Sequence, residues 1–201
     1  MRRRPGIFVV ALVAAWALVP VSARADGSAL IDLARLGRDG LGWGGWAGPQ
    51  FKPTMLAGSF CLYGGGPVVI LAGPSLGFGL NVSLPDGDAD GLSLYYAAAR
   101  AEYTLFPERR LHLSLSLDAG GGVASHDGER AGTAVLEPQA LCTVNLWRSF
   151  RLGLGASYRL AVLLGELPGY SPLELSAPCA VVQMQYGLFP TARPPRTEAA
   201  R

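Results

Sequence analysis

The sequence has little charge and few of the side chains that catalysis and metal binding use. Only 16% of the 201 residues are charged, and the net charge is +2, which excludes the basic surface of a nucleic-acid-binding protein. The chain has two histidines and three cysteines, with no C-x-x-C pair and no zinc-ligand spacing. Half of the residues are hydrophobic, which excludes intrinsic disorder. No run of eighteen apolar residues follows the N-terminus, which argues against membrane-spanning helices.

The N-terminus has the pattern of a secretory signal peptide. Arg2, Arg3 and Arg4 precede the apolar segment Ile7–Val19, and Ala23-Arg24-Ala25 forms an A-x-A cleavage site. We therefore expect residues 1–25 to be removed after Ala25 and the chain to be exported to an oxidising compartment. In segment 26–42, residues 28–36 have helical spacing, with Ser28 as a candidate N-cap, so this segment is predicted to be a short periplasmic helix or a linker.

Three cysteines are an odd number for a disulfide framework. Cys61, Cys142 and Cys179 lie far apart in the sequence. A Cys61–Cys179 disulfide is one interpretation. We favour the other, three small apolar residues of the protein wall, because a free cysteine packs like a small hydrophobic side chain.

From residue 42 onward hydrophobicity alternates with a period of two. In Leu111–Asp118 every odd position is leucine and every even position is polar, which predicts a strand with one apolar and one polar face. Comparable segments predict eight strands in all: 46–56, 59–71, 75–83, 92–105, 111–118, 135–146, 150–160 and 177–189. Strands of this length, about 9–11 residues when tilted, can cross the hydrocarbon core of a bilayer.

The predicted connections alternate between short and long. Residues 72–74, 106–110 and 147–149 are short turns, whereas 85–91, 120–132 and 161–174 are long and rich in Gly, Pro and Asp. Short turns at one end and long loops at the other are typical of outer-membrane barrels. The predicted fold is all-β: an eight-stranded antiparallel up-and-down transmembrane β-barrel with a polar lumen over residues 43–189, followed by a disordered tail, 190–201.

The charged residues of the polar faces are predicted to line the lumen. They are Lys52, Arg100, Glu102, Asp118, Glu137, Arg151 and Arg159. Four positive and three negative groups nearly cancel, as a buried ionic network requires. Most of them lie on consecutive strands, so we expect a salt-bridged plug in one half of the interior, with Glu137 and Arg159 as candidate partners.

The opposite faces carry regularly spaced aromatic residues. Tyr95 and Tyr103 are eight residues apart, as are Phe150 and Tyr158, which corresponds to about 26 Å along a strand. This spacing suits two aromatic girdles around a lipid band. The predicted girdle residues are Tyr95, Tyr103, Phe150, Tyr158 and Tyr186.

No motif supports catalysis or cofactor binding. His112, Ser114 and Asp118 share one strand face, but His112 and Asp118 would be near 20 Å apart, beyond hydrogen-bond reach. The loop with Asp86, Asp88 and Asp90 imitates the start of a calcium loop, yet the closing glutamate is absent. We expect a solvated acidic loop, no metal, no cofactor and no enzymatic activity.

Several segments resemble uncharacterised small outer-membrane β-barrel proteins of Gram-negative bacteria. These are 44–52 (GGWAGPQFK), 136–138 (LEP) and 152–159 (LGLGASYR), and the similarity runs over roughly residues 43–189. The end of the last strand, 185–189 (QYGLF), resembles the signal that the barrel-assembly machinery reads, although twelve residues follow it. The resemblance implies an outer-membrane location and, as partners, outer-membrane lipid, lipopolysaccharide and the assembly machinery. It implies no reaction and no nucleic-acid partner.

The residues leave three functions open. The first is a monomeric outer-membrane barrel with a structural, envelope-integrity or surface-interaction role. The second is a soluble periplasmic lipocalin-like barrel that binds an apolar ligand, since such a barrel also alternates apolar and polar faces. The third is a small channel or a lipid-modifying membrane enzyme.

Overall fold

The computed structural model describes residues 42–171 and 173–190. The predicted signal peptide, nearly all of segment 26–42 and all but the first residue of the 190–201 tail lie outside these residues. The described part of the chain is all-β, and none of it forms a helix long and apolar enough to cross a membrane. Its strands are β1 (Trp43–Ala47), β2 (Gln50–Leu56), β3 (Ser59–Ala72), β4 (Leu76–Pro85), β5 (Leu92–Leu105), β6 (Leu111–His126), β7 (Glu129–Trp147), β8 (Phe150–Leu163) and β9 (Ala177–Leu188).

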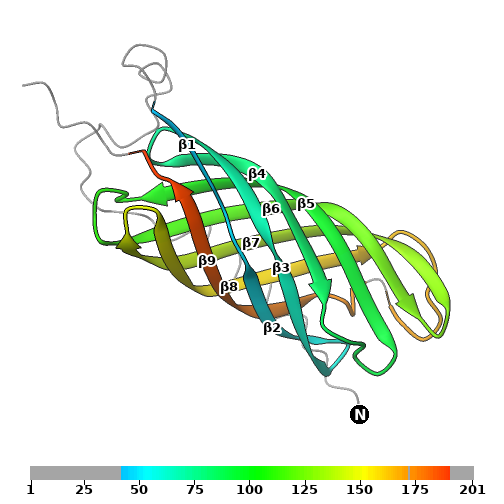
Figure 1. The fold of residues 1–201 in the computed structure, drawn as a ribbon. Helices are drawn as coiled ribbons and strands as arrows, with labels where there is room; N and C mark the ends of the chain where they lie inside the picture. Colours follow the sequence, from blue (N-terminus) through cyan, green and yellow to red (C-terminus); the bar gives the residue numbers. More distant parts are fainter. Residues whose placement is uncertain (1–41, 172, 191–201) are drawn as a thin grey trace, which may run out of the picture. The chain divides into compact units, whose positions relative to one another are not determined.

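The strands form one closed antiparallel barrel (Figure 1). From β3 to β9 each strand pairs with the next, and β1 and β2 both lie between β3 and β9. These two strands are the halves of one wall strand, interrupted at Gly48-Pro49, where proline lacks a backbone N–H for the ladder. The barrel therefore has eight wall strands, and the predicted eight-stranded antiparallel up-and-down barrel is confirmed.

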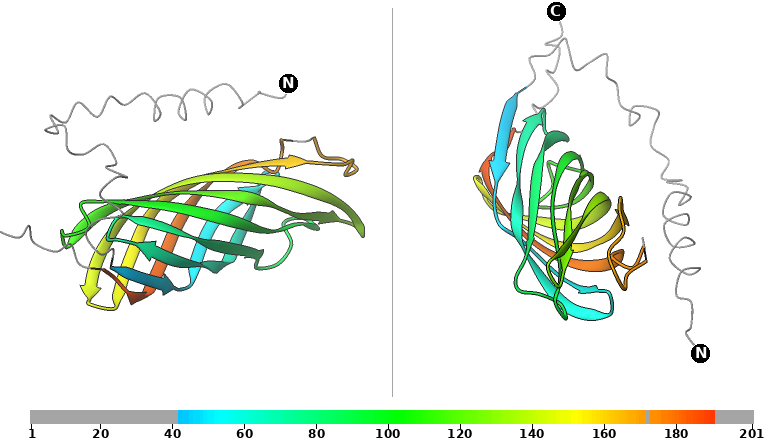
Figure 2. Two further views of the ribbon diagram at one scale, coloured as in Figure 1. Left: turned by 90° about the horizontal axis from the view of Figure 1, so that it is seen from above. Right: turned by 90° about the vertical axis from the view of Figure 1, so that its right-hand side faces the viewer.

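The two ends of the barrel differ (Figures 1 and 2). At one end, here called the turn end, lie the connections 73–75, 106–110 and 148–149, together with the start of β1 and the end of β9. At the other, the loop end, lie 57–58, 86–91, 127–128 and 164–176.

The prediction of a long loop over residues 120–132 is wrong. β6 continues to His126, β7 starts at Glu129, and only Asp127-Gly128 lies between them. Both of these residues have positive φ, 50° and 88°, as a tight type I′ hairpin turn requires. The marked difference between the ends therefore depends chiefly on one loop, 164–176.

The interior of the barrel has three layers. At the loop end an apolar cluster fills the lumen, and its members are Leu56, Cys61, Tyr63, Ala89, Leu92, Leu94, Tyr96, Ala124, Ala131, Val135, Ala161, Leu163, Leu167 and Leu175. At the turn end, Trp46, Val69 and Leu71 pack together with Phe189. Buried polar and charged side chains lie between these two clusters, and others, such as Thr104, His112 and Ser114, lie beside the small cluster at the turn end. The predicted polar lumen thus extends from the middle of the barrel to the turn end, and the apolar cluster closes the loop end.

The interpretation that Cys61 and Cys179 form a disulfide is wrong. Both cysteines are free and buried, and both pair in register with Thr54, one from each side of β2. Two interstrand spacings separate their Cα atoms by roughly 10 Å, whereas a disulfide needs less than about 7 Å. Cys142 is free and exposed on the outer wall.

Candidate functional site

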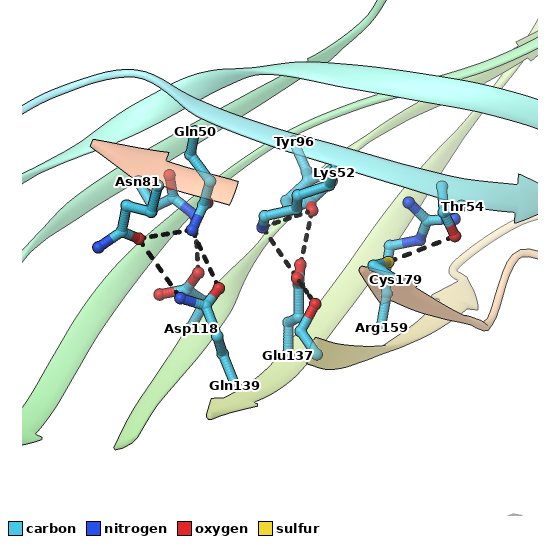
Figure 3. Close-up of polar contacts among 12 residues, drawn as sticks. Gln50, Lys52, Thr54, Asn81, Tyr96, Asp118, Glu137, Gln139, Arg159 and Cys179 are labelled. Carbon is cyan, nitrogen blue, oxygen red and sulfur yellow. Dashed lines mark hydrogen bonds and ion pairs between the residues drawn. The ribbon is translucent and has the colours of Figure 1, made fainter. Parts of the chain in front are cut away.

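The middle layer of the lumen is the candidate site, because it gathers nearly all the buried charge of the described chain. All seven sequence-predicted lumen residues are buried there or at its margins: Lys52, Arg100, Glu102, Asp118, Glu137, Arg151 and Arg159. Side chains alternate between the two faces of a strand, and each of these groups occupies an inward position of β2, β5, β6, β7 or β8. Figure 3 shows that most of them form three separate groups.

The first group is centred on the ion pair between Arg100 and Asp118. These residues are direct partners on β5 and β6. Arg100 Nε lies 2.7 Å from Asp118 Oδ1, and Nη2 donates to Oδ2 at 2.9 Å, the two-pronged geometry of a strong charge-assisted pair. Asn81 of β4 donates a third hydrogen bond to Asp118 Oδ2 at 2.7 Å.

Three glutamines connect this pair to the far side of the barrel. Gln50 Nε2 donates to Gln139 Oε1 at 3.0 Å and to Gln183 Oε1 at 2.6 Å. Arg100 Nη1 also donates to Gln183 Oε1, at 3.1 Å. None of these glutamines was singled out from the sequence, although all three occupy inward positions of their strands. Their amides carry the hydrogen bonds across the lumen.

The second group is centred on the carboxylate of Glu137. Lys52 Nζ lies 2.8 Å from Glu137 Oε1, and both side chains are about 1% exposed or less. The Tyr96 hydroxyl donates a hydrogen bond to Glu137 Oε2 at 2.6 Å, and the Ser157 hydroxyl donates one to Glu137 Oε1 at 2.5 Å. Glu137 is therefore paired with Lys52 across the lumen, and the candidate pairing of Glu137 with Arg159 is wrong. The network also spans the whole barrel, from β2 to β7, rather than one half of it.

The third group surrounds Arg159. Its guanidinium stacks on the ring of Tyr63, 4.6 Å from the ring centre, and Nε donates to the carbonyl of Leu175 at 3.2 Å. Thr54 donates to the carbonyl of Pro178, and Cys179 donates to Thr54. Neither Nη1 nor Nη2 of Arg159 has a hydrogen-bond partner among the described residues.

The remaining predicted lumen residues lie toward the turn end. The guanidinium of Arg151 stacks on Phe189 with 3.6 Å to the ring centre. Glu102 is buried near the turn end of β5. His112 is buried at the start of β6, and neither ring nitrogen has a described partner.

The predicted girdle residues all lie on the outer face, at two levels. Tyr103, Phe150 and Tyr186 are near the turn end, and Phe150 is the direct partner of Tyr186. Tyr95 and Tyr158 lie nearer the loop end. Two tryptophans that the sequence analysis did not assign, Trp43 and Trp147, are each 70% exposed at the turn end. Trp147 packs against Phe150, 5.6 Å between ring centres.

The arrangement offers no constellation for catalysis or metal binding within residues 42–171 and 173–190. Asp118 is committed to Arg100, and His112 lies six residues along the same strand. In the acidic loop, Asp90 accepts a hydrogen bond from Ser59. The described residues contain no group of three or more metal-ligating side chains.

Comparisons with known proteins agree on the fold alone. No protein-family model matches the chain, and no curated protein sequence matches it. The crystal structure of Neisserial surface protein A is similar, with a TM-score of 0.52 and 11% sequence identity. The match covers 74% of this chain and 99% of the Neisserial one. The chain has the fold of a small barrel of that kind.

Proposed function

We propose that this chain is an integral outer-membrane β-barrel protein with a structural, envelope-integrity or surface-interaction role. In this proposal it is exported by the signal peptide 1–25 from the cytoplasm of a Gram-negative cell. Its partners are outer-membrane lipid, lipopolysaccharide and the barrel-assembly machinery, and it works as a monomer without catalysis.

The observation that carries the proposal is the inverted distribution of polarity. The charged side chains of the middle strands face inward and are buried, whereas large apolar side chains face outward on every side of the barrel. Leu80 is 66% exposed and Val68 is 61% exposed. A contiguous apolar surface of this extent marks a membrane or a partner interface, and an outward apolar band with a polar interior is the arrangement of membrane barrels.

The aromatic residues support the same placement. Tyr95 and Tyr158 toward the loop end, and Tyr103, Phe150 and Tyr186 at the turn end, border the apolar band above and below. Aromatic side chains at two interfaces are typical of barrels in lipid. The name of the structurally similar Neisserial protein describes it as a surface protein, which agrees with this placement.

The end of β9, which we propose as the assembly signal, has residues on both faces of the barrel wall. Tyr186 and Leu188 of β9 are exposed on the outer wall, while Phe189 packs into the turn-side cluster. In our proposal the assembly machinery reads the outward residues, because the inward one becomes buried as the barrel closes.

The competing soluble lipocalin-like barrel would need the opposite polarity. Its apolar face would line the cavity and its charged face would contact water. Here Lys52 and Glu137 are buried in the lumen, while Phe60 and Leu80 are exposed outside, so we favour the membrane protein.

Cell fractionation distinguishes the two. We expect the chain to be recovered in the outer-membrane fraction and to migrate differently on detergent gels before and after boiling, because a closed barrel resists unfolding by detergent. Recovery in the soluble periplasmic extract, with one mobility on both gels, would contradict the proposal.

The channel alternative makes a separate prediction. In planar lipid bilayers we expect no steady open conductance, because an apolar cluster fills the loop end of the lumen and the ionic groups fill its middle. Leu167 and Leu175, in the connection between β8 and β9, are themselves part of the apolar cluster at the loop end. A large, stable conductance would show that the lumen is open and would favour a porin-like function.

A further inference from the structure

We propose that the lumen holds a small monovalent anion of the halide class against the guanidinium of Arg159. This site lies between the loop-side apolar cluster and the Lys52–Glu137 pair. It is separate from the two ion pairs that occupy the rest of the polar layer.

The guanidinium of Arg159 is a buried cation without an anionic partner among the described residues. Arg159 is 0% exposed, and only its Nε has a partner, the carbonyl of Leu175. Its Nη1 and Nη2, with four N–H donors in all, are buried without an acceptor among the described residues. A buried charge is very costly unless it is paired and hydrogen-bonded, so the structure requires an acceptor at this guanidinium.

No carboxylate of the lumen can be that acceptor. Asp118 accepts from Arg100 and Asn81, and Glu137 accepts from Lys52, Tyr96 and Ser157. Glu102 is near the turn end of β5, whereas Arg159 is near the loop end of β8.

The buried positive and negative charges of the lumen do not cancel. The buried charged groups of the described chain are four cations and three carboxylates, apart from His112. One positive charge is in excess, and Arg159 is the cation without an anionic partner that is most completely buried. A single negative charge neutralises the lumen, which favours a monovalent anion over sulfate or phosphate.

The surroundings suit a small, weakly hydrated ion. Tyr63, whose ring covers one face of the guanidinium, has a buried hydroxyl without a described partner. Thr54 and Cys179 lie on the same side of the lumen as Arg159 (Figure 3). The apolar side chains toward the loop end exclude water, which strengthens the attraction between an anion and the guanidinium.

Halide-dependent unfolding tests the site. The chain, folded in detergent micelles, is unfolded with urea in sodium chloride, sodium bromide or sodium gluconate at equal ionic strength. If the folded barrel alone binds the halide, each tenfold increase in free halide above its Kd raises the folded-to-unfolded ratio about tenfold. Gluconate, which is too large for the lumen, is expected to leave the ratio unchanged.

Two variants assign the effect to one residue. Arg159→Met should abolish the difference between halide and gluconate, whereas Arg151→Met, which removes the other lumen arginine without a carboxylate partner, should retain it. If Arg159→Met fails to fold, crystals of the unaltered protein soaked in bromide still decide the matter by an anomalous peak at the Arg159 Nη atoms. Equal midpoints in chloride and gluconate, or a bromide map without that peak, would mean that only water solvates Arg159 and would overturn the proposal.

Discussion

Replacing Glu137 with leucine is expected to lower the free energy of unfolding by about 3–5 kcal/mol, the usual cost of breaking a buried ion pair from one side. The variant leaves Lys52, which is 1% exposed, as an uncompensated charge. It also removes the acceptor of the Tyr96 and Ser157 hydroxyls. Urea unfolding of the barrel in detergent or lipid, followed by tryptophan fluorescence, measures the loss.

The double variant Lys52→Met/Glu137→Leu should recover most of that stability, because replacing a buried pair with apolar side chains is often neutral or stabilising. The matched control is Glu137→Leu/Arg159→Met. It removes a cation that does not contact Glu137, so Lys52 remains unpaired and stability should not recover. If the two double variants behaved alike, the assignment of Lys52 as the partner of Glu137 would be wrong.

The second large effect is expected on the outer wall. Leu117 is 44% exposed on the outward face of β6, near the middle of the strand. If this face contacts lipid, Leu117→Arg should cost about 2–4 kcal/mol, as arginine does at the bilayer midplane. The measurement is folding stability in lipid vesicles, together with recovery of the variant in the outer membrane.

Val123→Arg is the matched control. Val123 lies on the same strand and face, six residues nearer the loop end, and is 43% exposed. An arginine close to the interface should cost only about 0–1 kcal/mol. On a soluble protein both positions would be ordinary surface sites, so equal and small effects of the two substitutions would exclude a lipid-facing wall.

The strands were predictable wherever one face of the sheet is apolar and the other polar. Leu111–Asp118 alternates leucine with polar residues, and β6 places those leucines outward. The prediction failed where glycines replace side chains on both faces. Residues 120–122 are glycines and were interpreted as a loop, yet they pair with Ala98, Ala97 and Tyr96 inside the sheet. The Asp127-Gly128 dipeptide, a strong hairpin signal, would have given the correct turn.

The members of the polar layer were predictable, but their partners were not. A charged residue at an inward position of a strand faces the lumen whatever its neighbours are, so the seven charged residues follow from alternation alone. Which of them meet depends on how far each strand is shifted along the barrel. Lys52 and Glu137 come from β2 and β7, which are not adjacent in the sheet. Tyr96, between outward Tyr95 and Ala97, was missed because two neighbouring tyrosines have no alternation of polarity.

The interruption at Gly48-Pro49 makes the wall weakest where the first and last strands meet. Three residue pairs join β1 to β9 and three join β2 to β9, whereas sixteen join β6 to β7. Pro49, Pro53 and Pro178 at this junction have no backbone N–H to donate. Segments with fewer backbone hydrogen bonds open at lower free energy. Amide protons along β9 should therefore exchange with solvent sooner than those of β6. Lateral separation of β9 from β2 should be the first step by which this barrel comes apart.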